Sequence, residues 1–158
     1  MTETHTHPVS APLADADAPP ELSVVVTLYN EAGSLDELHR RAVAALGDLG
    51  RPFELVYVDD GSTDDTFAIL TDLHAADRRV RAIRFKRNFG QHPAMHAGLS
   101  RARGEIIVTM DGDLQNLPED IPKLVAAVDA GYDVASGRRA ARHDSWGRTL
   151  PSRLINGM

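Results

Sequence analysis

EIIVTMDGDLQ, residues 105–115, is the stretch that decides the fold. Ile106 to Met110 form a nearly unbroken apolar run, which predicts a strand buried on both faces of a sheet. The run ends in Asp111-Gly112-Asp113, and side chains two apart in an extended segment point the same way. Both carboxylates are therefore expected to converge on one point, where Gly112 leaves room for a ligand or an ion to approach the backbone.

Two converging carboxylates repel each other unless a cation lies between them, and hard oxygen ligands suit Mg2+ or Mn2+. Asp111 and Asp113 are therefore candidate metal ligands. An isolated Asp-Gly-Asp sequence is also common in polar turns at the ends of strands. The rest of the chain has to decide between these two interpretations.

Apolar runs and helical patterns alternate along the rest of the chain. Besides the run at residues 106–110, strands are predicted at residues 22–29, 53–58, 80–85 and 132–135. Helices are predicted over residues 35–49, 67–74, 93–102 and 118–128, with one more beginning near residue 151. This alternation predicts an α/β fold, in which a mostly parallel sheet is flanked by helices.

Two local features of the helices are also predicted. Ser34 and Glu37 have the spacing of a capping box at the start of the first helix. His74 falls on the apolar side of the second helix, so it is expected to be a half-buried packing residue.

Polar side chains follow four of the predicted strands, at Asn30-Glu31, Asp59-Asp60, residues 87–92 and residues 111–115. Because ligands of open parallel sheets bind beyond the carboxyl ends of the strands, these clusters predict one site. A nucleoside diphosphate joined to a transferable group suits it. Asp59 or Asp60 would accept a hydrogen bond from the imide N–H of uracil, and Tyr29 would stack on the base. A cation would bridge the phosphates and take up charge as the diphosphate leaves.

Composition narrows the class of protein. A chain of 158 residues with 42% hydrophobic residues has the size and core of one globular domain. The formal net charge of -6 argues against a general nucleic-acid binder. The absence of cysteine excludes disulfides and thiolate metal sites. Neither a signal peptide nor an apolar run long enough for a transmembrane helix is recognised within these residues.

The sequence divides into three predicted parts. Residues 1–21 are predicted to be a disordered tail, and residues 22–136 are predicted to form the nucleotide-sugar-binding core. Residues 137–158 are basic, because five arginines stand against the single acid Asp144, and such a segment suggests an anionic partner. The chain stops where a helix is expected to begin, so a truncated C-terminus is expected.

Four ordered stretches resemble the family-2 inverting glycosyltransferases of the GT-A (Rossmann-like) fold: TLYNE (27–31), VDDGSTDDT (58–66), RNFGQHPAMHAG (87–98) and MDGDLQ (110–115). DLQNLPEDIPKLV and RHDSWGRTLPSRLIN are similar to the polyprenyl-phosphate glycosyltransferase subgroup. That subgroup includes dolichyl-phosphate mannose synthase and the bacterial undecaprenyl-phosphate 4-deoxy-4-formamido-L-arabinose transferase. Leu28 departs from the pattern, because many relatives carry proline there. The run Gly137-Arg138-Arg139 leaves open which arginine takes the family's position.

The resemblance implies roles for particular residues. The nucleotide-binding residues that it implies are Leu28, Tyr29, Glu31, Asp59, Asp60, Gly61, Asn88, Gln91, Asp111, Gly112 and Asp113. The implied metal ligands are Asp111, Asp113 and Gln115, and the implied acceptor residues are Arg138, Arg142, Arg148 and Ser152. Asp111, Asp113, Arg138 and Arg148 are the implied catalytic residues.

The resemblance also implies an activity, the Mg2+- or Mn2+-dependent transfer of a sugar from a UDP-sugar to a polyprenyl phosphate, with inversion. The whole protein is then expected to be a cell-envelope enzyme at the cytoplasmic face of a membrane, attached through a region missing from this sequence. A lipid phosphate is already an anion, so it needs neutralising and aiming by arginines more than it needs a strong base. Asp144 is a candidate base or orienting residue.

The sequence also bears on four other functions. A family-2 glycosyltransferase with a non-lipid acceptor and a non-catalytic nucleotide-binding fragment both stay open. A phosphohydrolase of the haloacid dehalogenase type is disfavoured, because Val58 stands where its nucleophilic aspartate is needed. A nucleotidyltransferase is disfavoured because TLYNEAGS lacks a glycine-rich phosphate loop with a basic residue. The sugar, the lipid, the oligomeric state and the activity of these residues alone do not follow from the sequence.

Overall fold

The computed structural model describes residues 19–137. Its elements follow the order β1 (Leu22–Leu28), α1 (Leu35–Gly47), β2 (Phe53–Asp59), α2 (Thr66–Ala76), β3 (Val80–Arg84), α3 (Gln91–Leu99), β4 (Ile106–Asp111), the 3-10 turn η1 (Pro118–Asp120) and α4 (Ile121–Asp129). The predicted alternation of strands and helices is confirmed.

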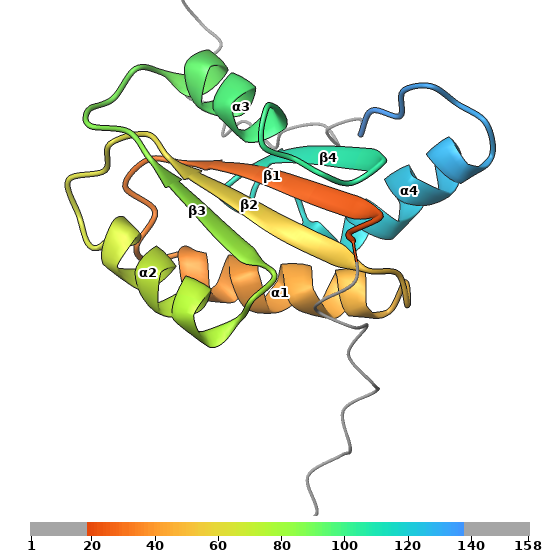
Figure 1. Ribbon diagram of the computed structural model, residues 1–158, viewed down its shortest axis with the longest axis horizontal. Coiled ribbons are helices and arrows are strands. Elements are labelled where there is room, and N and C mark those ends of the chain that lie inside the picture. The colour runs from red at the N-terminus through yellow and green to blue at the C-terminus, as the bar shows by residue number, and fades with distance from the viewer. Residues whose placement is uncertain (1–18, 138–158) are drawn as a thin grey trace, which may run out of the picture.

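The four strands form a parallel sheet in the order β3-β2-β1-β4. Helices α1, α2 and α4 lie along one face of the sheet, and α3 lies on the other (Figure 1). The two central strands, β1 and β2, are buried along their whole length. Since parallel strands covered on both faces need apolar side chains in both directions, this burial explains the run Val24-Val25-Val26.

Strand β4 does not have the burial that its apolar run predicts. Val108 and Met110 are buried in the main core, but Ile107 is 41% exposed and Thr109 is exposed as well. The prediction of burial on both faces is therefore wrong. Within the described residues β4 is an edge strand, and α3 packs on β1 and β2 instead of covering it.

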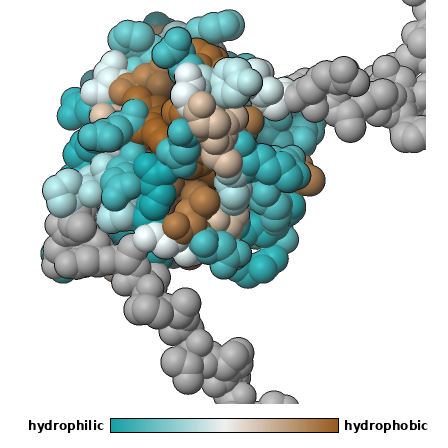
Figure 2. Space-filling model, turned by 90° about the vertical axis from the view of Figure 1, so that its right-hand side faces the viewer, coloured by the Kyte–Doolittle hydropathy of each residue, from teal (hydrophilic) through white to brown (hydrophobic). Residues whose placement is uncertain are grey.

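Apolar side chains gather in a band on the side of the molecule that carries α4 (Figure 2). Two hollows of about 470 and 290 Å3 lie along β4 and α4, and both are lined by Val108, Thr109 and Leu124. The predicted strand at residues 132–135 is not formed, which corrects the sequence analysis. Tyr132 and Val134 are 66% and 82% exposed, because this short segment pairs with no strand among residues 19–137.

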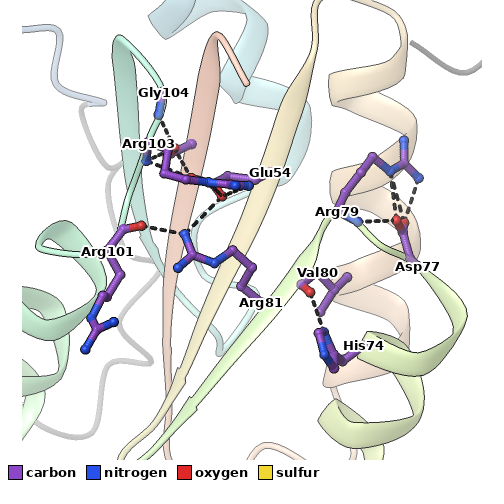
Figure 3. Close-up of polar contacts among 10 residues, drawn as sticks. Glu54, His74, Asp77, Arg79, Val80, Arg81, Arg101, Arg103 and Gly104 are labelled. Atoms are coloured by element: carbon purple, nitrogen blue, oxygen red, sulfur yellow. Dashed lines mark hydrogen bonds and ion pairs between the residues drawn. The ribbon is translucent and has the colours of Figure 1, made fainter. Parts of the chain in front are cut away.

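The prediction of a capping box at Ser34 and Glu37 is also wrong. The Ser34 hydroxyl makes no cap to its own helix, and it donates to the Glu31 carboxylate at 2.6 Å. The Glu37 carboxylate accepts from Arg40 on the following turn. His74 is exposed instead of half-buried, and its Nδ1 lies 2.6 Å from the Val80 carbonyl oxygen (Figure 3).

Residues 1–18 of the predicted tail, and residues 138–158 with the helix predicted near residue 151, lie outside the described part of the chain. Between residues 19 and 137, none of the helices has both the length and the apolar character needed to cross a membrane.

The amino ends of the strands are held together by one buried carboxylate (Figure 3). Glu54, near the start of β2, is 1% exposed. It accepts hydrogen bonds from the Ser23 hydroxyl at 2.8 Å, from the Arg103 backbone N–H at 2.7 Å and from the Arg81 guanidinium at 3.2 Å. The Arg103 guanidinium forms a further ion pair with Glu54 at 2.8 Å. Three strands and the turn before β4 therefore meet at a single side chain.

We expect Glu54 to contribute to acid unfolding. Burial alone would raise its pKa, but the hydrogen bonds from Ser23, Arg103 and Arg81 outweigh burial and hold the pKa below its ordinary value of 4.5. A carboxyl group whose pKa is depressed in the folded state stabilises the fold above its unfolded pKa, and this contribution is lost as the pH falls through the folded pKa.

The measurement is urea unfolding of the unaltered protein and of Glu54→Gln, from neutral pH down to about pH 3. The difference between their free energies of unfolding is expected to shrink as the pH falls. A difference that stays constant over this range would contradict the role assigned to the Glu54 charge.

Candidate functional site

The carboxyl edge of the sheet opens into a cavity of about 330 Å3. Its lining residues come from the ends of β1 and β4, the residue after β2, and the start of α3 with the loop before it. They are Thr27, Leu28, Tyr29, Glu31, Asp60, Asn88, Gly90, Gln91, Ala94, Asp111, Gly112 and Asp113. The structure thus brings together the residues for which the family resemblance implies a nucleotide-binding role, except Asp59 and Gly61.

Asp111 and Asp113 both line this cavity, although not for the reason predicted. The strand ends at Asp111, and Asp113 lies in a turn that closes at Leu114, whose φ is 57°. The Asp113 carboxylate accepts a hydrogen bond from the Gln115 backbone N–H at 3.0 Å. The two carboxylates are therefore brought together by a turn, and not by the alternation of side chains along a strand.

The Asp111 carboxylate is oriented by its neighbours. Its Oδ1 accepts a hydrogen bond from the Gln91 amide and lies 3.5 Å from the Thr27 hydroxyl. Gly112 beside it is buried, and a Cβ there would lie 2.2 Å from Leu28 Cδ2. The missing side chain thus allows close packing of this turn against β1, while Gly112 also lines the cavity.

The lining is strongly acidic. Glu31, Asp60, Asp111 and Asp113 contribute four carboxylates, and none of the lining residues between positions 19 and 137 is lysine or arginine. An anionic diphosphate would be repelled from this cavity unless a cation entered with it. Mg2+ and Mn2+ suit the donors present, because such ions are commonly held by one or two carboxylates together with substrate phosphates.

Among residues 19–137 no further acid joins the two aspartates as a candidate metal ligand. In the described part of the chain, no group of three or more His, Cys, Asp or Glu side chains is arranged to hold a metal. The side chain implied as the third ligand, Gln115, lines the hollow beside α4 and not this cavity. The two aspartates therefore fit a metal that takes its remaining ligands from phosphate and water.

Ser34 joins two sides of the site, which the sequence analysis missed. Its hydroxyl lies 2.6 Å from the Glu31 carboxylate and 3.3 Å from the Gly112 carbonyl oxygen. The loop after β1 is fixed from its other side, since the Glu31 backbone N–H donates to the Thr66 hydroxyl at 2.8 Å. The sequence signal for Ser34 is its place just after Asn30-Glu31, but its spacing from Glu37 favours a helix cap over a role in the site.

The structure separates the two neighbouring acids at the end of β2. Asp60 lines the cavity, and its two oxygens accept hydrogen bonds from the backbone N–H groups of Phe89 and Gly90, both at 2.8 Å. Asp59 is fully buried, accepts from the Ser62 backbone N–H at 3.0 Å and lies 3.5 Å from the Arg84 guanidinium. Of the two candidates for contacting a base, only Asp60 lies at the cavity.

Gly61 acts on the site through the backbone. Its φ is 72°, and a Cβ added there would lie 2.3 Å from the Arg87 carbonyl carbon. Only glycine therefore lets the end of β2 approach the loop that forms one wall of the cavity.

Gly61→Ala is expected to destabilise the fold by about 2 kcal/mol more than Gly50→Ala. Gly50 is a matched control, because its φ of 63° is similar but nothing lies within 4 Å of its added Cβ. The midpoints of urea unfolding measure the difference. Equal costs for the two variants would contradict the close contact with Arg87.

The implied acceptor residues lie outside the described part of the chain; they are Arg138, Arg142, Arg148 and Ser152.

Residues 23–156 match the family model described as glycosyl transferase family 2. The chain belongs to this family. This family-2 chain is similar to several curated proteins named undecaprenyl-phosphate 4-deoxy-4-formamido-L-arabinose transferase. It is 49% identical over 140 residues to the protein of that name from Edwardsiella ictaluri (strain 93-146), and 49% identical over 139 residues to that from Enterobacter sp. (strain 638).

These alignments cover 87% and 86% of the family-2 chain but 42% of each relative. The chain thus spans about two fifths of the length of the curated relatives it matches.

Solved structures agree with the family and with the predicted GT-A-like α/β fold. S. aureus TarS 1-349 superposes with a TM-score of 0.56 and 28% identity, covering 70% of this chain and 32% of TarS 1-349, and it has also been solved with UDP-GlcNAc. A mannosyltransferase from Pyrobaculum calidifontis, in complex with GDP-Man and Mn2+, superposes with a TM-score of 0.52 and 25% identity. That alignment covers 67% of this chain and 31% of the mannosyltransferase.

Proposed function

We propose that the protein binds the donor in an inverting glycosyltransferase that moves a sugar from a UDP-sugar to a polyprenyl phosphate. The observation that carries the proposal is the cavity at the carboxyl edge of the sheet. Four carboxylates line it, including those of Asp111 and Asp113, and its described lining contains no lysine or arginine. The names of the relatives support a lipid phosphate acceptor, and the TarS complexes support a UDP-linked donor.

In this proposal Asp111 and Asp113 hold Mg2+ or Mn2+. When bound, the ion neutralises the diphosphate and stabilises the charge that develops on UDP as the bond to the sugar breaks. Gln91 and Thr27 keep the Asp111 carboxylate turned toward the cavity. Tyr29, which is 45% exposed at the cavity, stacks on the base, and Asp60 accepts from its imide N–H.

The acceptor is a phosphate monoester, which is already anionic near neutral pH. Its oxygen attacks the anomeric carbon from the side opposite UDP, so the configuration inverts and the electron pair of the broken C–O bond leaves with UDP. Arg138, Arg142, Arg148 and Ser152 are proposed to bind and aim this phosphate. The whole protein is proposed to act at the cytoplasmic face of a membrane.

The proposal is tested with this chain in two assays. Calorimetry with UDP and either Mn2+ or Mg2+ is expected to show weak, metal-dependent binding. Sugar transfer from radiolabelled UDP-sugars to undecaprenyl phosphate is expected to be slow, because the chain spans only part of the length of its relatives. Undecaprenol, which lacks the phosphate, is the matched control acceptor.

The outcomes separate the alternatives. No UDP binding with either metal would overturn the proposal. Binding with transfer only to a non-lipid acceptor would favour a different family-2 activity, and binding without any transfer would favour a nucleotide-binding fragment.

A further inference from the structure

The loop between β3 and α3 carries an exposed aromatic side chain beside the cavity. Phe89 is 53% exposed, and it does not line the cavity although its neighbours Asn88 and Gly90 do. Its ring is therefore not part of the cavity that is proposed to bind the donor. Lys86 and Arg87, just before it, are exposed as well.

This loop is held firmly in place. The Asp60 carboxylate binds the backbone N–H groups of Phe89 and Gly90, and Gly61 packs closely against the Arg87 backbone. The Phe89 ring is itself supported, since its centroid lies 5.6 Å from that of Phe85 in an edge-to-face contact. The Arg87 guanidinium lies 4.8 Å from the Phe89 ring centroid. The contacts thus fix a large apolar ring in an exposed position.

The segment of sequence that carries the ring differs in charge from the chain as a whole. The whole chain has a formal net charge of -6, but residues 84–92 contain three lysine or arginine residues and no acid. One of the three, Arg84, is committed to the buried Asp59 and stacks over the Phe67 ring. Lys86 and Arg87 remain as the cations beside Phe89. This combination fits an anionic partner that also accepts an aromatic ring.

We propose that Lys86, Arg87 and Phe89 form a docking surface for a membrane that contains anionic phospholipid. Basic side chains near a membrane surface are attracted to anionic headgroups, and aromatic rings settle at the boundary between headgroups and acyl chains. The role of this contact rests on the proposed function, because docking on a membrane would bring the donor cavity close to an acceptor carried by a lipid. The contact itself does not depend on nucleotide binding.

The sharpest test places a fluorescent probe at the ring. The only tryptophan of the chain, Trp146, is first replaced in W146F, and F89W is then added. With phosphatidylglycerol vesicles, the F89W emission is expected to shift to shorter wavelength and to be quenched by brominated acyl chains. The matched control is Y132W in the same background, since Tyr132 is 66% exposed and lies after α4. It is expected to show neither effect.

A charge variant tests the cations. K86A/R87A is expected to lower the vesicle-bound fraction of the chain roughly tenfold in sedimentation at low salt, with phosphatidylcholine vesicles as the uncharged comparison. R40A/K123A removes two exposed cations on α1 and α4 and is expected to leave binding unchanged. This comparison separates the loop from general attraction by exposed cations on α1 and α4.

The results distinguish this proposal from the proposed function. Absent quenching of F89W, equal quenching of Y132W, or equal losses in the two double variants would overturn the docking surface, even if UDP still bound. Absent quenching together with capture of a protein would point to a protein partner in place of the lipid. Quenching of F89W in a chain that does not bind UDP would support the docking surface and overturn the donor site.

Discussion

Asp111→Asn and Asp113→Asn are each expected to weaken Mn2+-dependent binding of UDP by on the order of 100-fold. The cavity holds four carboxylates and, in its described lining, no basic residue, so the diphosphate depends on a cation for its attraction. Replacing either aspartate with its amide keeps the shape of the side chain but removes one of the two negative charges that would hold the ion. Titration calorimetry with and without Mn2+ measures the effect.

The matched control is Asp72→Asn, because Asp72 is an exposed acid on α2 and does not line the cavity. This variant is expected to bind UDP as the unaltered chain does. Melting temperatures should agree among the three variants, because neither cavity aspartate is part of the apolar core. If Asp111→Asn and Asp113→Asn bound UDP with unchanged affinity in Mn2+, the assignment of the metal to this pair would be wrong.

Glu54→Gln is expected to destabilise the fold by about 3 kcal/mol, which corresponds to roughly 10 °C in Tm. The buried carboxylate faces Arg81 and Arg103, and its amide would present N–H donors to groups that are themselves donors. The cost lies at the lower end of the range for a broken buried ion pair, because the Arg81 and Arg103 side chains are 32% and 59% exposed and can regain water.

Glu119→Gln provides the comparison for Glu54→Gln. Glu119 also pairs with an arginine, Arg41 at 2.6 Å, but its side chain is 53% exposed. A solvent-exposed pair contributes at most about 1 kcal/mol, so this variant is expected to unfold close to the unaltered protein. Urea midpoints and thermal melts followed by circular dichroism measure both variants. Equal stabilities of Glu54→Gln and Glu119→Gln would show that burial of the Glu54 charge is unimportant.

Much of the fold was accessible from the sequence, because the signals are local. The apolar periods of four strands and four helices, and the polar residues after each strand, predicted the parallel sheet and the edge that carries the cavity. The failures occurred where a segment's role depends on a distant partner. The pattern at residues 132–135 suits a strand, but no strand among residues 19–137 pairs with it. The run in β4 suits a central strand, but among residues 19–137 this strand lies at an edge of the sheet.

The candidate site shows the same division. The sequence by itself determined the fold class and brought Tyr29, Asp60, Asp111 and Asp113 to one edge, because parallel strands deliver their carboxyl ends to the same side of a sheet. Only the tertiary structure decided that Asp60 and not Asp59 faces the cavity, that Gly61 receives the Arg87 backbone, and that Glu54 joins the opposite ends of the strands. These features arise from contacts between residues far apart in the chain, and no local pattern of residues records which of them will meet.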